Sequence, residues 1–223
     1  MKQIGVVIPS LNERDYIVGT INSVYENGIS EIVVSDGGST DGTVDCLSRF
    51  PNLRLVHSPR GRGYQINVGI ELLRSEFVIV LHADTRLPQG ADDQIRGALA
   101  DPAVACGCFR LNFDEQRELL KFSAWISRYE SYWTTFGDQA FFFRRSDFKR
   151  IGGAPDWPLF EDVELRQRFR TVGDFKKMQS CITTSARRFR SHGPVRTQFL
   201  NTVLLTGFAL GISPERLSGF YRR

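Results

Sequence analysis

The sequence predicts an α/β protein with a mostly parallel central sheet flanked by helices. Over the first hundred residues, short apolar runs rich in β-branched residues alternate with helix-length stretches, which is typical of βαβ units. A hydrophobic content of 41%, with 12% aromatic residues, is enough for a sizeable core. The 223 residues contain no internal repeat, low-complexity tract or linker, so we expect a single domain over residues 1–223.

The first half is expected to hold four parallel strands, each followed by a helix. The expected strands are residues 3–8, 31–36, 53–58 and 76–82, and the expected helices are residues 15–27, 41–50, 63–74 and 89–100. Sheets of this kind bind ligands at the carboxyl ends of their strands. We therefore expect a binding edge made of four loops, residues 9–13, 36–41, 59–63 and 82–85.

The alternation changes after residue 100. The pattern predicts a strand over residues 103–113, an aromatic-rich helix over residues 115–133, a strand over residues 139–145 and a polar helix from about Glu161. Near the end of the chain, Ser213 and Pro214 are suited to the N-cap and first position of another helix. The second half is thus expected to differ in topology from the first.

The tail contains an uncharged stretch, residues 197–214, that is largely apolar over residues 199–212. It is shorter than the roughly 20 residues that a membrane-spanning helix needs. Two interpretations stay open. The stretch is either a helix packed on the core or on a second copy in a homodimer, or a helix lying in a membrane interface between flanking arginines.

Charge is distributed unevenly along the chain. The net charge is +4, but residues 1–143 hold 13 Lys/Arg against 18 Asp/Glu, and residues 144–223 hold 16 against 7. The basic second half suits a phosphate-bearing ligand or an anionic membrane surface, although a solvated basic face is equally compatible with it. No recognised nucleic-acid-binding motif accompanies the basic residues, which disfavours nucleic acid as a partner.

The cysteines and the amino terminus favour a cytoplasmic protein, with the inner face of the membrane as a possible place of action. Cys46, Cys106, Cys108 and Cys181 form no pair of CxxC motifs, as expected of ordinary thiols in a reducing compartment. The opening residues "MKQIGVVIPS" do not form a signal peptide, because Pro9 ends a short apolar run.

Two common nucleotide signatures are missing. The first expected strand is not followed by GxGxxG, and GxxxxGK[ST] does not occur, which argues against a dinucleotide enzyme and a P-loop NTPase. Gly61, Arg62 and Gly63 open the third expected helix, where backbone N–H groups could hold a diphosphate.

Three groups of acids are candidates for chemistry. Asp36 ends a strand and could accept hydrogen bonds from a base edge. The alternative is that residues 39–41 only cap the next helix, and both can hold if Asp41 caps while Asp36 binds. Asp84 follows another strand, where it could bind Mg²⁺ or Mn²⁺ bridging phosphates or else cap a turn. Glu161, Asp162 and Glu164 begin a helix, where one could act as a general base, although acids are common in first turns.

Six motifs in order connect these residues to a known family. The chain contains "VVIPSLNE", "VSDGGSTDGT", "RGRGYQINVG", "LHADT", "GDQAFFFRR" and "FEDVEL". From about residue 4 to 190 it resembles a family 2 glycosyltransferase with the GT-A fold. The ending "GISPERLSGFYRR" resembles that of a small bacterial subgroup with an HAD variant of the DxD motif.

The resemblance implies an inverting, metal-dependent transfer from a nucleotide-diphosphate sugar to a hydroxyl acceptor. A UDP-sugar is the favoured donor, the cofactor is Mg²⁺ or Mn²⁺, and a lipid-linked compound is one candidate for the acceptor. The resemblance also divides the chain into a nucleotide-binding half (1–100), an acceptor and catalytic half (101–192) and a helical tail (193–223). The tail is the expected contact to a membrane or a second copy.

The resemblance also implies the role of individual residues. Those expected at the donor nucleotide are Pro9, Leu11, Glu13, Asp36, Arg60, Gly61, Asn67, His82 and Ala83. Those expected at the metal are Asp84 and His192, and those expected near the sugar and acceptor are Gly137, Asp138 and Trp157. Asp162 is the expected catalytic base, with Glu161 as the less favoured candidate.

One residue departs from the family pattern. His82 occupies the first position of the DxD motif, where the family has an acid. It could contact the ribose or a metal ligand, bind the metal directly, or have only a structural role. Arg187, Arg188 and Arg190 could face the diphosphate leaving group or form an exposed basic strand.

Two other functions remain as alternatives. A sugar-phosphate nucleotidyltransferase is disfavoured because "PSLNERD" stands where its Gly-rich loop is expected. A non-catalytic nucleotide-binding or membrane-associated protein is disfavoured by the Glu161–Asp162 pair.

Overall fold

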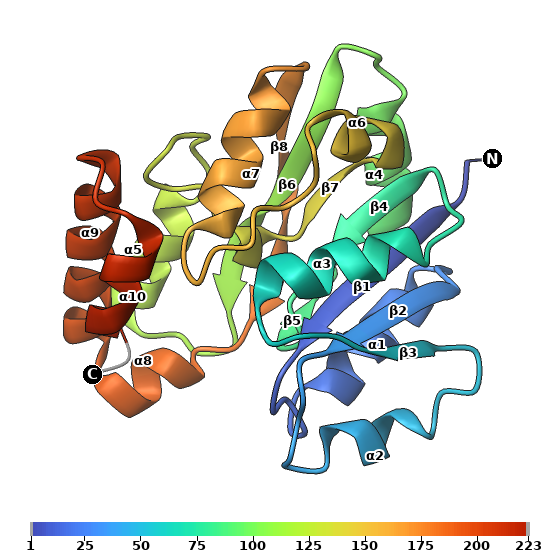
Figure 1. The fold of residues 1–223 in the computed structure, drawn as a ribbon, viewed down its shortest axis with the longest axis horizontal. Coiled ribbons are helices and arrows are strands. Elements are labelled where there is room, and N and C mark those ends of the chain that lie inside the picture. Colours follow the sequence, from blue (N-terminus) through green and yellow to red (C-terminus); the bar gives the residue numbers. More distant parts are fainter. Residues whose placement is uncertain (1, 222–223) are drawn as a thin grey trace.

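The computed structural model describes residues 2–221, except for the side chains of residues 191, 192, 194 and 221. An eight-stranded sheet in the order β3-β2-β1-β4-β7-β6-β8-β5 runs through the molecule, with helices on both faces (Figure 1). The fold class predicted from the sequence, a mostly parallel sheet flanked by helices, is confirmed.

The parallel half of the sheet comes from the first eighty residues. β1 (Ile4–Ser10) lies between β2 (Glu31–Asp36) and β4 (Phe77–Val80), and β2 also pairs with β3 (Arg54–His57). All residues of β1 and β4 are buried, as expected for strands covered on both faces. The carboxyl ends of these strands meet at one edge of the sheet.

The second half adds mixed pairing. β7 (Phe141–Arg144) runs antiparallel to both β4 and β6 (Val104–Phe113), and β6 runs parallel to β8 (Asp174–Thr184). The two-residue strand β5 (Thr85–Arg86) pairs antiparallel with the end of β8. This last pairing brings the loop after β4 beside the segment that follows β8.

Two apolar clusters fill the two sides of the sheet. One includes apolar residues of α1 (Ile17–Glu26), α4 (Ala91–Leu99) and α5 (Glu118–Ile126). The other includes residues of α3 (Arg62–Glu71), α6 (Arg145–Arg150) and α7 (Glu161–Arg170). α3 and α7, which begin at the two halves of the candidate site, therefore cover the same side.

Several sequence expectations needed correction. The 41–50 helix is only α2 (Thr43–Leu47), and the aromatic helix expected over residues 115–133 ends at Ile126. β8 and α6 were not predicted. β8 alternates between exposed and partly buried positions and is rich in lysine and polar residues, so its sequence lacks the apolar period of an ordinary strand. Residues 187–192 form the helix α8 (Arg187–His192), so the alternative of an exposed basic strand for the arginines there is wrong.

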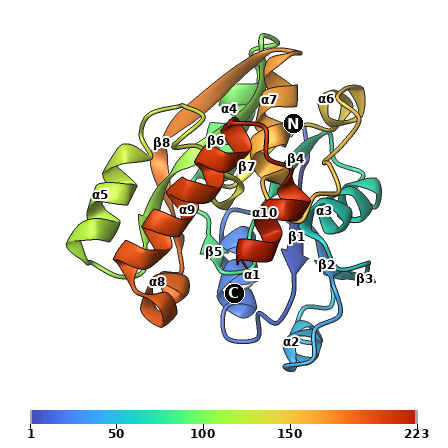
Figure 2. The same cartoon turned by 60° about the vertical axis from the view of Figure 1, so that its left-hand side comes forward.

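Two helices end the chain. α9 (Pro194–Ala209) and α10 (Pro214–Tyr221) contact each other (Figure 2). α9 buries Leu204 and Leu205, and α10 buries Leu217. None of the helices within residues 2–221 combines the length and the apolar content needed to cross a bilayer. The tail thus packs on the rest of the protein through part of its surface.

Candidate active site

The loops after β1 and β2 are held together by hydrogen bonds. The backbone N–H of Glu13 donates to Thr43 Oγ1 at 2.7 Å, and that of Arg14 donates to Asp41 Oδ2 at 3.1 Å. Asn12 has a positive φ of 57° and its Oδ1 accepts from the backbone N–H of Thr40 at 2.9 Å. These bonds form a rigid corner around the place where the resemblance expects the nucleoside.

Asp36 organises the second loop. Its buried carboxylate accepts hydrogen bonds from the backbone N–H groups of Gly38 and Ser39, both at 2.9 Å, and from Ser39 Oγ at 2.5 Å. His57 Nδ1 lies 3.8 Å from the same carboxylate. Asp36 therefore shapes the loop, and its contact with a base stays a prediction.

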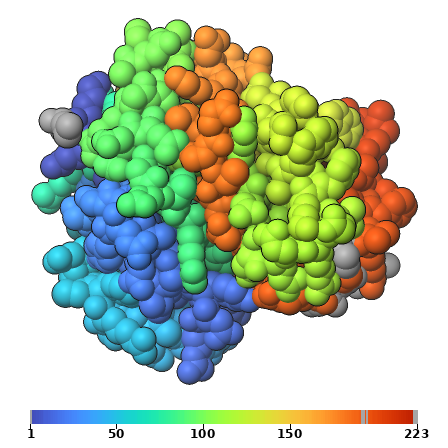
Figure 3. Space-filling model, turned by 180° about the vertical axis from the view of Figure 1, so that it is seen from behind, coloured from blue at the N-terminus to red at the C-terminus, as the bar shows by residue number. Residues whose placement is uncertain are grey.

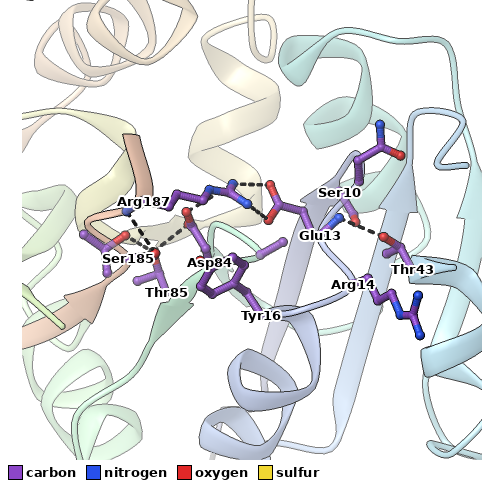
Figure 4. Close-up of polar contacts among 12 residues, drawn as sticks. Ser10, Glu13, Arg14, Tyr16, Thr43, Asp84, Thr85, Ser185 and Arg187 are labelled. Atoms are coloured by element: carbon purple, nitrogen blue, oxygen red, sulfur yellow. Dashed lines mark hydrogen bonds and ion pairs between the residues drawn. The ribbon is translucent and has the colours of Figure 1, made fainter. Parts of the chain in front are cut away.

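Arg187 joins the loops after β1 and β4 (Figure 4). Its guanidinium donates to both carboxylate oxygens of Glu13, at 2.6 and 2.5 Å, and its Nη2 lies 3.2 Å from Asp84 Oδ2. The guanidinium also covers the ring of Tyr16 at 4.9 Å. Burial raises the pKa of Asp84 and of Glu13, and the positive charge of Arg187 opposes both increases.

The surroundings of the Asp84 carboxylate suit a divalent cation. Its side chain is 15% exposed and already faces a positive group, the guanidinium of Arg187. Hard oxygen ligands are those that Mg²⁺ and Mn²⁺ take, often with one or two carboxylates only. Among the described residues no three His, Cys, Asp or Glu side chains form a ready cluster for a metal. Asp84 fits a cation whose other ligands come from phosphates.

His82 is held in its neutral form. Burial lowers its pKa well below the usual value, and the positive charges of Arg62, Arg187 and Arg188 lower it further. A neutral imidazole surrounded by three guanidinium groups can donate or accept one hydrogen bond without adding charge. These arginines come from both ends of the chain and favour an anion at this place.

Arg62 connects the two halves of the site, and sequence reasoning gave it no side-chain role. Its Nη1 lies 2.8 Å from Glu161 Oε1; the Arg62 side chain is 43% exposed and that of Glu161 only 3%. Burial raises the pKa of Glu161 to about 6 although Arg62 lowers it. The pKa of Arg62 is raised, most of all by the negative charge of Glu161. Burial lowers it, and the charges of Asp162, Asp138 and Asp84 raise it further.

Asp162 is positioned by backbone groups. Its Oδ2 accepts a hydrogen bond from the N–H of Gly137 at 2.6 Å, and its Oδ1 accepts from the N–H of Val163 at 2.8 Å. A Cβ at Gly137 would lie 2.9 Å from Asp162 Cβ, so only glycine allows this approach. Each carboxylate oxygen keeps further acceptor capacity for a hydroxyl.

Asp138 lies beside Asp162 with a buried oxygen. No described residue donates a hydrogen bond to its Oδ1. Burial, and after it the negative charge of Asp162, raise the pKa of Asp138 to about 6. The neighbouring Gln139 accepts a hydrogen bond from Lys177 Nζ at 2.5 Å, a cation on β8 that sequence reasoning missed because the strand itself was not predicted.

The remaining candidates lie around this centre. Asn67 Oδ1 accepts from the backbone N–H of Ala154 and its Nδ2 donates to Ala154 O, both at 2.9 Å, so the amide holds the loop before α7. Arg60 is exposed, and Gly61 has a φ of 147°. The Trp157 ring packs 5.9 Å from that of Phe208 on α9.

Three residues predicted to bind the donor lie at the carboxyl edge of the sheet. Pro9 is buried in β1, Leu11 follows that strand and is half-buried, and the Ala83 carbonyl accepts from Thr20 Oγ1 at 2.8 Å. The side chain of His192 lies outside the described part of the structure. The predicted donor, metal, base and acceptor roles of all these residues stay predictions.

Residues 5–152 match the model of Glycosyl transferase family 2. This match covers well over half of the chain, and the chain therefore belongs to glycosyltransferase family 2.

Curated relatives match a shorter stretch. TuaG of Bacillus subtilis, a putative teichuronic acid biosynthesis glycosyltransferase, is 30% identical over 91 residues, which is 37% of this chain and 36% of TuaG. A dolichyl N-acetyl-α-D-glucosaminyl phosphate diacetamido-dideoxy-glucuronosyltransferase of Methanococcus voltae is 31% identical over 94 residues, 37% of this chain and 29% of that protein. This chain thus spans about a third of the length of these relatives.

Solved structures share the fold over most of the chain. The mannosyltransferase PcManGT of Pyrobaculum calidifontis, in complex with GDP-Man and Mn²⁺, has a TM-score of 0.72 at 20% identity and covers 96% of this chain and 66% of its own. S. aureus TarS in complex with UDP-GlcNAc has a TM-score of 0.66 at 17% identity, covering 83% and 59%. The predicted GT-A fold is thereby confirmed.

The His82→Asp substitution tests the departure from the family motif. A carboxylate there would add a metal ligand and would attract the guanidinium groups that now favour an anion. We expect Mn²⁺ binding without nucleotide to tighten about tenfold, a change equivalent to about 1.4 kcal/mol. Titration of Mn²⁺ monitored by electron paramagnetic resonance measures this, and unchanged affinity would show that residue 82 does not reach the metal.

The raised pKa of Asp138 makes the free energy of unfolding depend on pH. Because its folded pKa is about 6 and its ordinary value is 3.8, the folded state binds more protons than the unfolded state between these values. Stability therefore falls as pH rises through this window, by up to about 3 kcal/mol. We expect Asp138→Asn to be more stable than wild type at pH 8 but not at pH 3. Urea unfolding at both pH values measures this, and equal stability at pH 8 would contradict it.

Arg187→Gln tests whether Arg187 recognises phosphate or only joins loops. We expect UDP affinity in the presence of chelator to fall about tenfold, because one positive group is lost from the anion site. Arg187→Lys should retain part of the affinity. Calorimetric titration measures this, and a lower melting temperature with unchanged UDP affinity would show a role in loop packing alone.

Proposed function

We propose that the protein transfers a sugar from a nucleotide-diphosphate donor to a hydroxyl acceptor with inversion at the anomeric carbon. The observation that supports this most is the meeting of three acids, Glu161, Asp162 and Asp138, with Arg62 where α3 and α7 begin, beside Asp84 and Arg187. An acid held by backbone N–H groups suits a base, and a group of guanidiniums suits a diphosphate.

In the proposed reaction, Asp162 accepts the proton of the acceptor hydroxyl. The acceptor oxygen then bonds to the anomeric carbon, on the face opposite the diphosphate, as the bond from that carbon to the diphosphate oxygen breaks. The electron pair leaves with the diphosphate, and Arg62, Arg187 and Arg188 stabilise its charge. Mg²⁺ or Mn²⁺ at Asp84 would supply further positive charge for this leaving group when bound.

Other groups hold the reactants in line. The hydrogen bond from Gly137 N–H fixes the Asp162 carboxylate, and the ion pair of Glu161 and Arg62 joins the start of α7 to the start of α3. The neutral imidazole of His82 is suited to a hydrogen bond with the ribose or with a ligand of the cation. Such positioning contributes much of the rate in reactions between two bound substrates.

We propose that three segments of the chain have different functions. Residues 1–100 bind the nucleotide, through Pro9, Leu11, Glu13, Asp36, Arg60, Gly61, Asn67, His82 and Ala83. Residues 101–192 supply Gly137, Asp138 and Trp157 for the sugar and acceptor, and residues 193–223 form the tail. His192 stays a candidate for the metal.

The donor and acceptor are proposed at the level of class. Solved relatives of the fold hold GDP-Man or UDP-GlcNAc, and a UDP-sugar is our favoured donor. The Methanococcus voltae relative carries a lipid-phosphate in its name, which supports a lipid-linked acceptor. We place the reaction in the cytoplasm, at the inner face of the membrane; the four free cysteines agree with a reducing compartment.

The product identifies the reaction. Incubation with a nucleotide-diphosphate sugar and Mn²⁺ should release nucleoside diphosphate slowly by transfer to water, and no pyrophosphate. Nuclear magnetic resonance of the released sugar should show the anomer opposite to that of the donor. Release of pyrophosphate would instead indicate a nucleotidyltransferase, and a retained anomer would exclude direct displacement.

A further inference from the structure

Exposed apolar side chains gather at one end of the molecule. Among the described residues, all the large exposed ones except Tyr64 come from α5, the segment after it, α9, the turn after it and α10: Phe122, Trp125, Tyr129, Trp133, Val195, Phe199, Val203, Leu210, Ile212 and Phe220. α9 contacts both α5 and α10. These helices lie side by side in Figures 1 and 2, and their yellow-green and orange-red atoms adjoin in Figure 3. We call this surface the tail face.

The exposure on this face is unusually high for apolar side chains. Leu210 is 79% exposed, Val195 74% and Phe199 70%, although α9 already buries Leu204 and Leu205. A surface helix ordinarily turns polar side chains outward opposite its buried stripe. Single exposed apolar residues need no explanation, whereas a gathered set marks a contact surface. The tail face therefore has the composition of a surface that something covers.

Basic residues accompany these apolar side chains. Among the described residues of α5, α9, α10 and the segments on either side of α5, the exposed charged side chains are Arg117, Lys121, Arg128, Arg196 and Arg216, against Asp114, Glu118 and Glu215. The Arg128 guanidinium lies over the ring of Trp125 at 5.0 Å. Proteins often place Trp and Tyr next to Arg and Lys at the boundary between lipid headgroups and acyl chains.

We propose that the tail face docks on the surface of an anionic lipid bilayer. Its apolar side chains would enter the boundary of the acyl region, and its surplus of basic groups would lie at the anionic headgroups. A second copy of the chain fits less well. A two-fold dimer through this face would bring the two basic surfaces against each other, where like charges repel.

The docked face adjoins the catalytic helix. Phe208 on α9 packs 5.9 Å from Trp157 and 5.0 Å from Phe160, the residue before Glu161 and Asp162. A hollow of about 460 Å³ lies between α7 and α9, lined by Tyr132, Glu164, Gln167, Phe208 and Ala209. An acceptor with an apolar tail could thus reach Asp162 from the membrane. This consequence rests on the proposed transfer reaction, whereas the docking does not.

Vesicle sedimentation with the full chain, without donor or acceptor, tests the docking. We expect binding to vesicles of phosphatidylcholine mixed with phosphatidylglycerol, weaker binding at high salt and little binding to phosphatidylcholine alone. Phe199→Ser combined with Leu210→Ser should reduce the partition to anionic vesicles by about tenfold or more, because two side chains that would enter the lipid are lost. Both side chains are exposed, so the fold should persist, which thermal unfolding verifies.

Two matched variants serve as controls. Tyr64→Ser removes the exposed aromatic ring outside the tail face, and Lys149→Glu reverses an exposed charge on α6, at the far side of the molecule in Figure 1. Both should bind anionic vesicles as wild type does. Arg196→Glu, which reverses a charge within the tail face, should weaken binding to anionic vesicles.

Three results would overturn the docking: wild type that ignores anionic vesicles, a double variant that binds like wild type, or controls that lose binding equally. A dimer in lipid-free solution that the double variant dissociates would also overturn it, because a second copy would then cover the face. Light scattering measures this last case. If vesicles bind but no nucleotide sugar does, the docking stands and the proposed function fails.

Discussion

Asp162→Asn is expected to lower transfer by about 10²- to 10⁴-fold, the range that a positioned general base contributes. The amide can still accept the hydrogen bond from Gly137 N–H through its oxygen, so the local structure should persist. It cannot take up the proton of the acceptor. Donor affinity should stay within about twofold of wild type, because in the proposed reaction the diphosphate is held by arginines and by a cation at Asp84, not by Asp162. Steady-state kinetics and calorimetric titration of the donor separate the two quantities.

Asp93→Asn is the matched control, because Asp93 is an exposed acid in the first turn of α4, distant from the arginine cluster. It should leave transfer and donor binding unchanged. Glu161→Gln decides between the two candidate bases. If Glu161→Gln abolishes transfer while Asp162→Asn retains it, the base is Glu161 and our assignment is wrong.

Asp84→Asn is expected to weaken donor binding in the presence of Mn²⁺ by about 100-fold, equivalent to about 2.7 kcal/mol. The substitution removes the carboxylate that would hold a cation against the diphosphate, and it also removes a partner of Arg187. Chelation of Mn²⁺ should weaken donor binding to wild type by a similar factor. Titration calorimetry with and without chelator measures both effects.

The two changes should not add. In Asp84→Asn, chelation should have little further effect if, as proposed, the cation and the carboxylate act as one unit. Asp93→Asn should respond to chelation as wild type does. A full response of Asp84→Asn to chelation would show that the cation is bound elsewhere, and His192 would then be the next candidate.

The parallel half of the fold was predictable because its information is local. β1 and β4 are continuous apolar runs buried on both faces, and such runs followed by helix-length stretches leave few alternatives. β8 was not predictable from its own residues. It pairs with β6 along a bulged register, and tertiary pairing rather than an apolar period makes it a strand.

The site was predictable only in part, for the same reason. The sequence places Asp84 at a strand end and Asp162 at a helix start, because both positions follow from local pattern. It does not indicate that Arg187 contacts Asp84, or that Arg62 pairs with buried Glu161, since these partners lie about a hundred residues apart. The lowered pKa of His82 comes first from its burial and then from arginines that only the fold brings together, and neither follows from local pattern.

The most direct test of the central claim is thermal unfolding in the presence of a panel of nucleotide-diphosphate sugars with Mn²⁺. A donor at about a hundred times its dissociation constant should add roughly 2.7 kcal/mol to the stability of the folded state. We expect at least one donor to raise the melting temperature of wild type and of Asp162→Asn alike, and to raise that of Asp84→Asn much less. A panel in which no nucleotide sugar shifts the melting temperature would contradict the proposed function.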